Sequence, residues 1–446
     1  MSYGAGRPAM GGPFGIMGAL MHCSRLLAGV LPGVFVLAAA SCDGSGDAAG
    51  AAPVVSDSAG VRVVLNRGVS FQAGVPAWRV SDRPETAIGR AGGDEAYLFD
   101  RIMGVERLSD GRWVVADMGS SQVRFYSPDG RHLHSVGRRG EGPGEFQQIM
   151  GMRRTRDDVL IIDDFPNRVH LLSADGAFDG VLRLPGSPID EQTRPAGSWR
   201  DGTMVARTTS PSPQMLSEPH TMTAMYHRAV FAHGPGDALE LNVLDTVGVF
   251  ETIRLVPGWR GGAHLVRLDG RTHTALLSDG LVIADPMMFE VRFLDTGGGV
   301  RVLAHTDWTF EPITQAVKDR DRELFTGGSG EGGNPMPAQM RQQRQDIADT
   351  WTYAPHLPAF AGMRVDDADH VWLREFLPNE QTIGGFVRAP VEQARWLVMA
   401  PDGVIVGRVQ LPARFAPLAV GEDFVAGVYR DEMDVEYVHS YRLTRR

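Results

Sequence analysis

The sequence predicts an all-β fold, a single six-bladed β-propeller with a helical hairpin insert between blades 4 and 5. Three observations lead to this prediction. Runs of apolar residues, alternating strands and tight turns recur in the same order along the chain. Glycine supplies 54 of the 446 residues, as expected for many short strands joined by turns. The repeats number six, and radial stacking of such units into a ring leaves few strand edges exposed.

The clearest repeats share four consecutive apolar residues, an acidic residue, an alternating strand and a turn. They occupy residues 104–130, 151–176 and 278–298. Apolar runs of strand length indicate strands covered on both faces, and Asp-Gly suits the positive φ of hairpin turns. Three weaker repeats pair 201–207 with 224–232, 369–375 with 395–403, and 422–430 with 436–443. A single four-stranded sheet cannot bury two apolar faces alone, so the repeats are expected to stack.

The last repeat ends at Leu443 without an obvious fourth strand. An N-terminal strand, from either Val61–Asn66 or Trp78–Gly89, is expected to supply it and close the ring. Residues 311–351 break the pattern, because they contain two stretches of helical periodicity around a glycine-rich segment. This insert either builds a binding face or only covers an exposed sheet surface.

Residues 1–41 have the features of an export signal. Arg25 precedes a 15-residue apolar run, 26–40, which is too short to span a bilayer comfortably and has the length of a signal core. Residues 39–42 (AASC) resemble a bacterial lipobox, so Cys42 is the candidate lipidation site. Residues 38–40 also fit an ordinary cleavage site, which would give a secreted or periplasmic soluble protein instead.

The small, polar residues 42–53 predict a flexible tether between the anchor and a propeller that spans 54–446. Acyl chains on the cysteine would hold the protein at a membrane surface without a spanning helix. We therefore expect an exported lipoprotein of the cell envelope that meets the membrane through its lipid anchor only.

Composition excludes two classes of partner and chemistry. The net charge is −10, and it becomes −12 without residues 1–41, which hold two arginines and no acidic residue. An acidic module has no electrostatic footprint for nucleic acid. The only cysteines are Cys23 and Cys42, so the mature domain has neither a disulfide nor a thiol nucleophile beyond the lipid site. The histidines are scattered without a metal-binding helix motif, and His132 and His134 are expected to be exposed on an outer strand.

Acidic residues close the apolar strands at equivalent positions and are therefore expected on one face of the ring. They are Asp117, Asp164, Asp285 and Glu375. Such a crown would offer a cation the oxygen ligands that calcium prefers. Alternatively, each carboxylate caps its own turn by accepting from backbone N–H groups. No other cofactor is indicated.

Two further features concern the channel and the joints between blades. Arg107, Arg153 and Arg364 follow glycines that are expected to begin the innermost strands, where these arginines either attract anionic groups or pair with the surplus acids. The glycine-rich segment 137–146 lacks the lysine of a phosphate-binding loop and contains two glutamates. We interpret it as a joint between two blades, in which glycine permits unusual φ angles.

The segments GRRGEGPGEF (137–146), VLIIDD (159–164) and RVHLLSADG (168–176) resemble NHL-repeat proteins. More closely, the chain resembles the bacterial 6-bladed beta-propeller family of exported lipoproteins, whose ends are similar to residues 56–66 and 431–443. The resemblance implies a six-bladed ring with inner strands at the axis and no enzymatic activity. A few propellers of related type are metal-dependent lyases or lactonases.

From these observations we expect a monomeric, non-catalytic binding module that takes a protein, peptide or glycan ligand on one face of the propeller. The alternative is a metal-dependent lyase or lactonase acting at the central channel. An enzyme needs histidine and acidic side chains that converge at the channel mouth, whereas a binder should expose an apolar or aromatic patch there.

Overall fold

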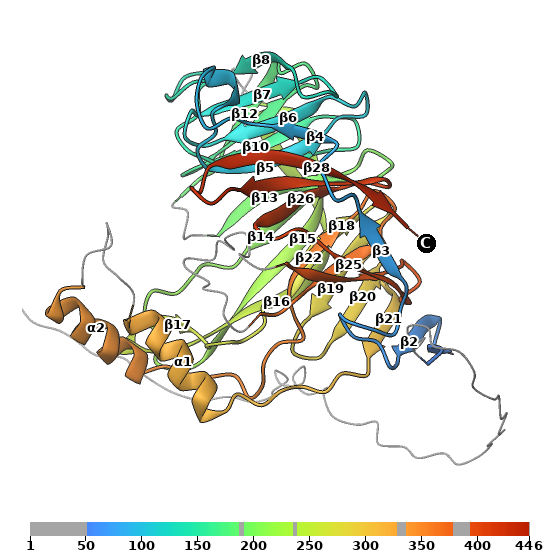
Figure 1. Cartoon of the computed structure of the whole chain (residues 1–446), viewed down its shortest axis with the longest axis vertical. Helices are drawn as coiled ribbons and strands as arrows, with labels where there is room; N and C mark the ends of the chain where they lie inside the picture. Colours follow the sequence, from blue (N-terminus) through green and yellow to red (C-terminus); the bar gives the residue numbers. More distant parts are fainter. Residues whose placement is uncertain (1–50, 187–190, 235–238, 328–335, 378–392, 446) are drawn as a thin grey trace, which may run out of the picture. The chain divides into compact units, whose positions relative to one another are not determined.

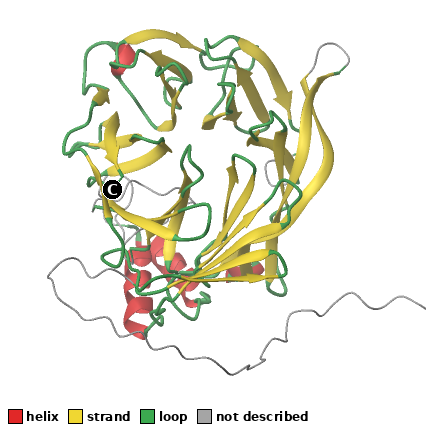
Figure 2. Ribbon diagram, turned by 90° about the vertical axis from the view of Figure 1, so that its right-hand side faces the viewer, coloured by secondary structure: helices red, strands yellow, loops and turns green. Residues whose placement is uncertain are grey.

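The computed structural model describes residues 51–186, 191–234, 239–327, 336–377 and 393–445. In this part of the chain the strands form six four-stranded antiparallel blades around a central axis, which confirms the six-bladed β-propeller (Figure 1, Figure 2). Two α-helices lie between the fourth and fifth blades, as predicted.

The first three blades follow one another along the chain. Blade 1 consists of β5 (Ile102–Arg107), β6 (Trp113–Asp117), β7 (Gln122–Tyr126) and β8 (His132–Val136). Blade 2 consists of β9 (Ile149–Arg154), β10 (Leu160–Asp164), β11 (Arg168–Leu172) and β12 (Phe178–Arg183). Blade 3 consists of β13 (Gln192–Ser198), β14 (Met204–Thr209), β15 (His220–His233) and β16 (Leu239–Pro257). The short strand β17 (Ala263–Leu265) pairs with the far end of β16.

Blades 4, 5 and 6 complete the ring. Blade 4 consists of β18 (His273–Leu277), β19 (Gly280–Asp285), β20 (Glu290–Leu294) and β21 (Val300–Thr306). Blade 5 consists of β22 (Phe360–Val365), β23 (Val371–Glu375), β24 (Arg395–Met399) and β25 (Ile405–Gln410). Blade 6 contains β26 (Phe415–Val420), β27 (Phe424–Arg430) and β28 (Glu436–Thr444). The weak repeats pair as predicted, namely β14 with β15, β23 with β24 and β27 with β28.

The N-terminal residues follow the outer edges of blades 4, 5 and 6 and close the ring. The hairpin of β1 (Val54–Ser58) and β2 (Val61–Asn66) adds to β21, and β3 (Ala77–Val80) adds to β25. The fourth strand of blade 6 is β4 (Thr86–Ile88), which pairs antiparallel with β28. Of the two predicted candidates, the segment Trp78–Gly89 therefore supplies the closing strand.

The core consists mainly of the apolar faces between neighbouring blades. The second strands β6 and β10 are almost completely buried, because a blade lies on each side of them. The joint between blades 1 and 2 is built as predicted. Phe146 is fully buried against Phe178 of blade 2, and its ring lies where a Cβ atom on Gly137 would stand, so only glycine fits there.

The innermost strands β5, β9, β13, β18, β22 and β26 surround the axis, and their direction defines two faces. We call the face where they begin the start face and the face where they end the end face. Because the strands of a blade alternate in direction, the second strands end on the start face, and each connection between blades crosses that face.

The helices α1 (Gln315–Thr326) and α2 (Ala338–Asp349) belong to such a connection, from β21 to β22, and lie near β17 (Figure 1). The Arg267 guanidinium, just after β17, bonds to the Asp321 carboxylate of α1, with a distance of 3.0 Å from Nε to Oδ2. Each helix has 12 residues, and no helix in the described ranges combines the length and apolarity that crossing a membrane requires.

Candidate ligand site in the central channel

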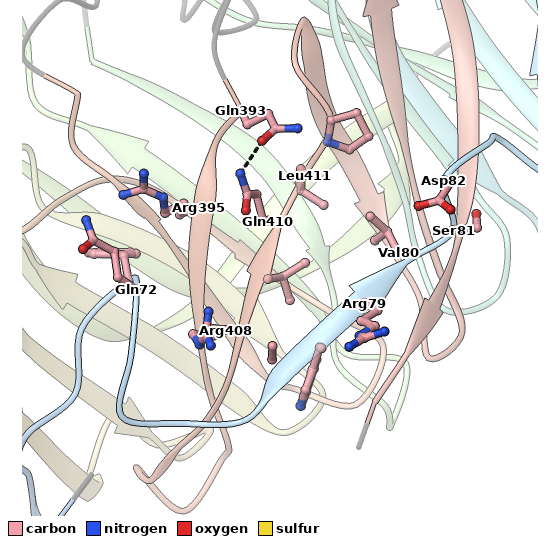
Figure 3. A pocket seen from close by; sticks show the side chains of 15 residues that line it. Gln72, Arg79, Val80, Ser81, Asp82, Gln393, Arg395, Arg408, Gln410 and Leu411 are labelled. Carbon is pink, nitrogen blue, oxygen red and sulfur yellow. Dashed lines mark hydrogen bonds between the residues drawn. The ribbon is translucent and has the colours of Figure 1, made fainter. Parts of the chain in front are cut away.

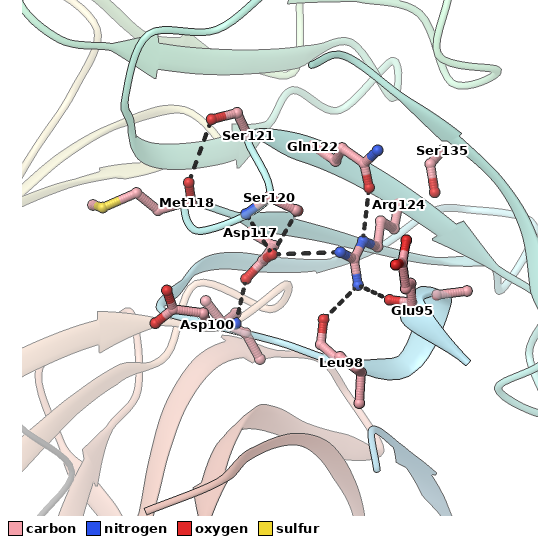
Figure 4. Close-up of polar contacts among 12 residues, drawn as sticks. Glu95, Leu98, Asp100, Asp117, Met118, Ser120, Ser121, Gln122, Arg124 and Ser135 are labelled. Carbon is pink, nitrogen blue, oxygen red and sulfur yellow. Dashed lines mark hydrogen bonds and ion pairs between the residues drawn. The ribbon is translucent and has the colours of Figure 1, made fainter. Parts of the chain in front are cut away.

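The acidic residues predicted to form a crown lie on the start face, at the ends of second strands. Asp117 ends β6 and accepts hydrogen bonds from the backbone N–H of Asp100 (2.8 Å) and from the hydroxyl of Ser120 (2.6 Å) (Figure 4). Its carboxylate also lies 3.5 Å from the guanidinium of Arg124, which donates to the backbone carbonyl of Leu98. Asp117 thus fastens the segment before β5 to the end of β6.

Asp164 repeats this arrangement in blade 2. Its carboxylate accepts from the backbone N–H of Gln148 (2.7 Å), pairs with Arg168 (2.5 Å) and contacts His170 (3.2 Å). Burial acts to raise the pKa of Asp164, but the hydrogen bonds from His170 and Gln148 and the charge of Arg168 outweigh it and lower the pKa. The charged carboxylate therefore stabilises the joint before β9.

The other two crown residues also bond within their own blades. Asp285 accepts from the backbone N–H of Met287 (2.8 Å), and Glu375 pairs with Arg395 of the next strand (3.2 Å). In the described part of the chain, no group of three or more His, Cys, Asp or Glu side chains is placed to hold a metal ion. The partners of these carboxylates favour the alternative of turn capping over a calcium crown. Cys42 lies outside the described residues.

Two of the three predicted channel arginines have acidic partners. Arg107 lies 3.8 Å from Asp423, and Arg153 pairs with Asp163 at 2.7 Å. Arg364 differs, because it donates hydrogen bonds to the backbone carbonyls of Met363 (2.9 Å) and Pro417 (3.3 Å). Arg364 therefore keeps its charge without a carboxylate in those bonds.

A group of basic residues surrounds Arg364, and we call it the basic cluster. Its members are Arg271, His273, Arg364 and Arg374, from the neighbouring blades 4 and 5. Burial, followed by the charges of Arg364, Arg374 and Arg271, lowers the pKa of His273 to about 4. Burial and the charge of Arg374 also lower the pKa of Arg364. These arginines therefore disfavour a proton on His273.

The end face of the channel has the opposite character. Arg154 of blade 2 reaches across the axis to Asp367 of blade 5 (3.7 Å) and also contacts Asp158 (2.9 Å) and Glu106 (3.9 Å). Nearby, Arg156 lies 3.9 Å from Asp369 of blade 5 and donates to Ser278 of blade 4. We call these contacts the axial network. Because blades 2 and 5 lie opposite each other in a ring of six, the network bridges the end face.

Acidic groups of the axial network carry raised pKa values. Burial, with the negative charge of Asp367, raises the pKa of Glu106 to about 7 against the opposing charge of Arg154. Burial also raises the pKa of Asp367. The carboxyl of Glu106 therefore takes up a proton at a higher pH than an ordinary glutamate does.

The sequence reasoning located Arg364 but missed Arg271, His273, Arg374 and the axial network. Gly362 is the local signal for Arg374, since the two residues face each other across β22 and β23. The predicted exposure of His132 and His134 is wrong. Both are half-buried, and His134 stacks on Phe125 with ring centroids 4.5 Å apart, because the outer strand β8 packs one side against its own blade.

The outer side of blade 5 holds a cavity of about 770 Å³ between β3 and β25 (Figure 3). Gln393 and Gln410 bond to each other within it, as Figure 3 shows. Two of its arginines have partners elsewhere, since Arg395 pairs with Glu375 and Arg408 donates to the carbonyl of Val75 at 3.2 Å. The cavity lies at the rim rather than at the axis, and we do not assign it a role.

Comparison with known proteins agrees with the architecture. Residues 94–198 match a family model described as "6-bladed beta-propeller", which confirms the resemblance seen in the sequence. The RING finger protein nhl-1 of Caenorhabditis elegans is 27% identical over 101 residues, which cover 23% of this chain and 10% of that protein. The match thus spans about a tenth of the length of this curated relative, and its NHL-type name agrees with the repeat pattern.

Solved structures with similar arrangement include two Bacteroides proteins. One from Bacteroides fragilis, described as exported, has a TM-score of 0.41 and 10% identity, with 83% of this chain and 99% of that chain covered. A member of the DUF4221 family from Bacteroides vulgatus has a TM-score of 0.46 and 10% identity over the same shares. A streptogramin B lyase has a TM-score of 0.33 and 11% identity, covering 81% of this chain and 97% of that chain. At this level of similarity these structures carry no argument about function.

Proposed function

We propose that this six-bladed propeller is an exported, non-catalytic binding module that takes its ligand at the start face, where the channel opens. The observation that carries the proposal is the difference between the two ends of the channel. The axial network bridges the end face through Arg154 and Asp367, which belong to opposite blades. A channel that is bridged at one end and open at the other suits the binding of a ligand better than its passage through the ring.

Additional strands and helices lie on the start face, at the proposed entrance of the channel. Strands β15 and β16 extend beyond β14 there, where His220 pairs with Leu255, and β17 adds to this end of β16; the two strands also extend at the end face, where His233 pairs with Leu239. The helical insert is fastened to this extension by Arg267, whose guanidinium also lies over the Trp351 ring, 4.1 Å from its centre. Insertions gathered on one face of a repeat ring commonly form its binding face.

His273 and its arginine neighbours are poorly suited to acid–base catalysis, and Glu106, the channel carboxyl with a pKa of about 7, belongs to the bridged end face rather than to the proposed ligand entrance. A general base at neutral pH needs a pKa near 7 and a partner that supports its protonation. His273 instead has a pKa of about 4 and lies among three arginines, so it is a weak base. This argument also weighs against the alternative of a lyase or lactonase, in which histidine and carboxylates must converge.

Export and anchoring belong to the same proposal. The apolar run and lipobox-like AASC in residues 26–42 support export with lipidation at Cys42. Acyl chains on Cys42 would then hold the propeller at a membrane surface, where it could meet ligands in the cell envelope.

The test is a screen of glycan and peptide arrays with the soluble Cys42→Ser protein and two matched variants. Leu265 on β17 and Leu133 on β8 are both exposed, at 43% and 38%. We expect Leu265→Glu, on the start face, to lose the ligand that the parent protein binds, and Leu133→Glu to keep it. Recovery of the bound ligand chemically unchanged supports a binding module. Conversion of the ligand, or equal binding by both variants, contradicts the proposal.

A further inference from the structure

The connections from second to third strands lie on the start face in all six blades, because each second strand ends there. Each of these connections carries a large apolar side chain. We call the six side chains the tip ring, and in blade order they are Met118, Phe165, Met215, Met288, Phe376 and Met433. The tip ring therefore surrounds the mouth of the channel at the proposed entrance.

The tip ring contains the most exposed large apolar side chains of the described residues. Met433, Met215 and Met288 are 74%, 67% and 61% exposed, more than any other large apolar side chain in that part of the chain. Phe165 is 44% exposed, and the other two members are half-buried. On the end face, by contrast, no described turn between strands carries an exposed large apolar side chain. An exposed apolar surface of this kind marks an interaction site, and here it belongs to the start face alone among the turns.

Carboxylates fix the backbone of the turns that present the tip ring. Asp431 accepts a hydrogen bond from the backbone N–H of Met433 at 2.9 Å. Asp285 accepts one from the backbone N–H of Met287, next to Met288, at 2.8 Å. The turn is thus held in place, while the methionine side chain, with three rotatable bonds, remains able to adapt to what it contacts.

The connections that carry the tip ring are also acidic. Their described residues contain eight Asp or Glu residues and no Arg, Lys or His, over the ranges 117–121, 164–167, 210–219, 285–289, 375–377 and 431–435. Three of these carboxylates pair with an arginine of their own blade. Of the other five, three lie in blade 6, where the exposed Glu432 and Asp434 flank Met433. The charge of the tips therefore favours a partner with positive charge.

From these observations we propose that the tip ring docks a polypeptide segment that carries apolar side chains together with lysine or arginine. The inference rests on the proposed function, because it assumes that the start face receives the ligand, and it selects polypeptide among the ligand classes. Flexible methionines repack around apolar side chains of different shape, so the ring suits a range of sequences. The acidic residues beside them attract the basic side chains of the partner.

A glycan and a lipid surface fit the tip ring less well than a polypeptide does. Thioether and phenyl groups have no hydrogen-bond donor for sugar hydroxyls, and a thioether sulfur is only a weak acceptor. A lipid surface that took up Met433 would also have to take up the carboxylates of Glu432 and Asp434, and burial of unpaired charges costs free energy. A peptide with both apolar and basic side chains meets both features of the tips.

The probe is a labelled peptide of about 18 residues, in which leucine and lysine alternate with helical periodicity. Fluorescence anisotropy would measure its binding to the soluble Cys42→Ser protein. Two further peptides separate its properties, one with serine in place of leucine and one with glutamate in place of lysine. We expect saturable binding of the leucine–lysine peptide and at least about tenfold weaker binding of the other two. Equal binding of the serine peptide would show attraction by charge alone and overturns the inference.

Two matched triple variants test whether the tip ring receives the peptide. The ring variant combines Met215→Ser, Met288→Ser and Met433→Ser. The control variant combines Val243→Ser, Leu244→Ser and Val249→Ser on β16, where the side chains are 47%, 60% and 56% exposed. The ring variant should bind the leucine–lysine peptide at least about tenfold more weakly, because it loses apolar surface for burial, and the control should bind it as the parent protein does. Equal binding by the ring variant and the parent, or equal weakening in both variants, contradicts docking at the tip ring.

The charge of blade 6 is tested by Glu432→Gln combined with Asp434→Asn, since asparagine tolerates the positive φ of 64° at position 434. This variant should bind the leucine–lysine peptide more weakly than the parent at low salt, and about 1 M salt should remove the difference, because it screens the charges. Unchanged binding at low salt contradicts the proposed charge of the partner. Flotation of the parent with phosphatidylcholine vesicles, lost in the ring variant, would identify lipid as the occupant and overturn the inference.

Failure of the two proposals would look different. An array glycan that depends on Leu265, with no binding of the leucine–lysine peptide, leaves the binding module intact and removes polypeptide as its ligand. Peptide binding that depends on the tip ring, together with chemical conversion of an array ligand, keeps the docking surface and contradicts the non-catalytic function.

Discussion

Replacing Glu106 by glutamine should make the stability of the propeller less dependent on pH. Glu106 lies at the axial network with 21% of its side chain exposed, 3.9 Å from Arg154. Burial raises its pKa from 4.5 to about 7. A raised carboxyl pKa means that the folded protein holds a proton that the unfolded chain releases. The stability from this proton is present below pH 4.5 and is lost as the pH rises through 7.

The size of this effect follows from the shift in pKa. Each pKa unit corresponds to about 1.4 kcal/mol, so the carboxyl of Glu106 removes roughly 2 to 3 kcal/mol of unfolding free energy between pH 5 and pH 8. Glutamine has nearly the same shape and no charge, so the loss should be absent in Glu106→Gln. The variant should therefore gain stability over the wild type as the pH increases.

Urea unfolding midpoints at pH 5, 6, 7 and 8 would measure the effect. Burial lowers the pKa of His439 to about 4 in both proteins, so both share the loss of stability that this histidine causes as the pH falls below about 6.5. Glu323→Gln serves as the control, since that carboxylate is 69% exposed on α1. Parallel pH profiles for wild type and Glu106→Gln would refute the assignment of a buried, protonated carboxyl to the axial network.

Three further measurements address closure, anchoring and the carboxylate crown. Ile88→Ala on β4 should cost about 2–5 kcal/mol of unfolding free energy, because Ile88 is 1% exposed. Leu65 on β2 is 36% exposed, so Leu65→Ala should cost clearly less. Equal losses of unfolding free energy in the two variants would contradict closure by β4. Cys42→Ser should move the protein from the membrane fraction to the soluble fraction, and a wild type that is already soluble would exclude lipidation. Calcium and a chelator should leave the melting temperature within about 1 °C, since the crown carboxylates have partners in their own blades; a larger rise with calcium would establish a cation site.

The sequence alone was sufficient for the ring because its blades are built from local patterns. Each second strand is apolar throughout, each turn contains glycine or small acidic residues, and these signals survive even in the irregular third blade. The helical insert was predictable for the same reason, since its periodicity of 3.6 residues differs from that of the strands around it. The choice between two closing strands was not local, because it depended on which segment reaches the free edge of β28.

The candidate site depended almost wholly on tertiary structure. A glycine opposite a charged residue can be recognised only when the register between β22 and β23 is known, and a shift by one residue would turn Arg374 to the other side of the sheet. Likewise, Arg154 and Asp367 meet only because closure of six blades places blades 2 and 5 across one axis. The amino-acid pattern thus determined that a ring forms, while ring closure decided which charges meet inside it, since contacts across the axis have no counterpart in the local sequence.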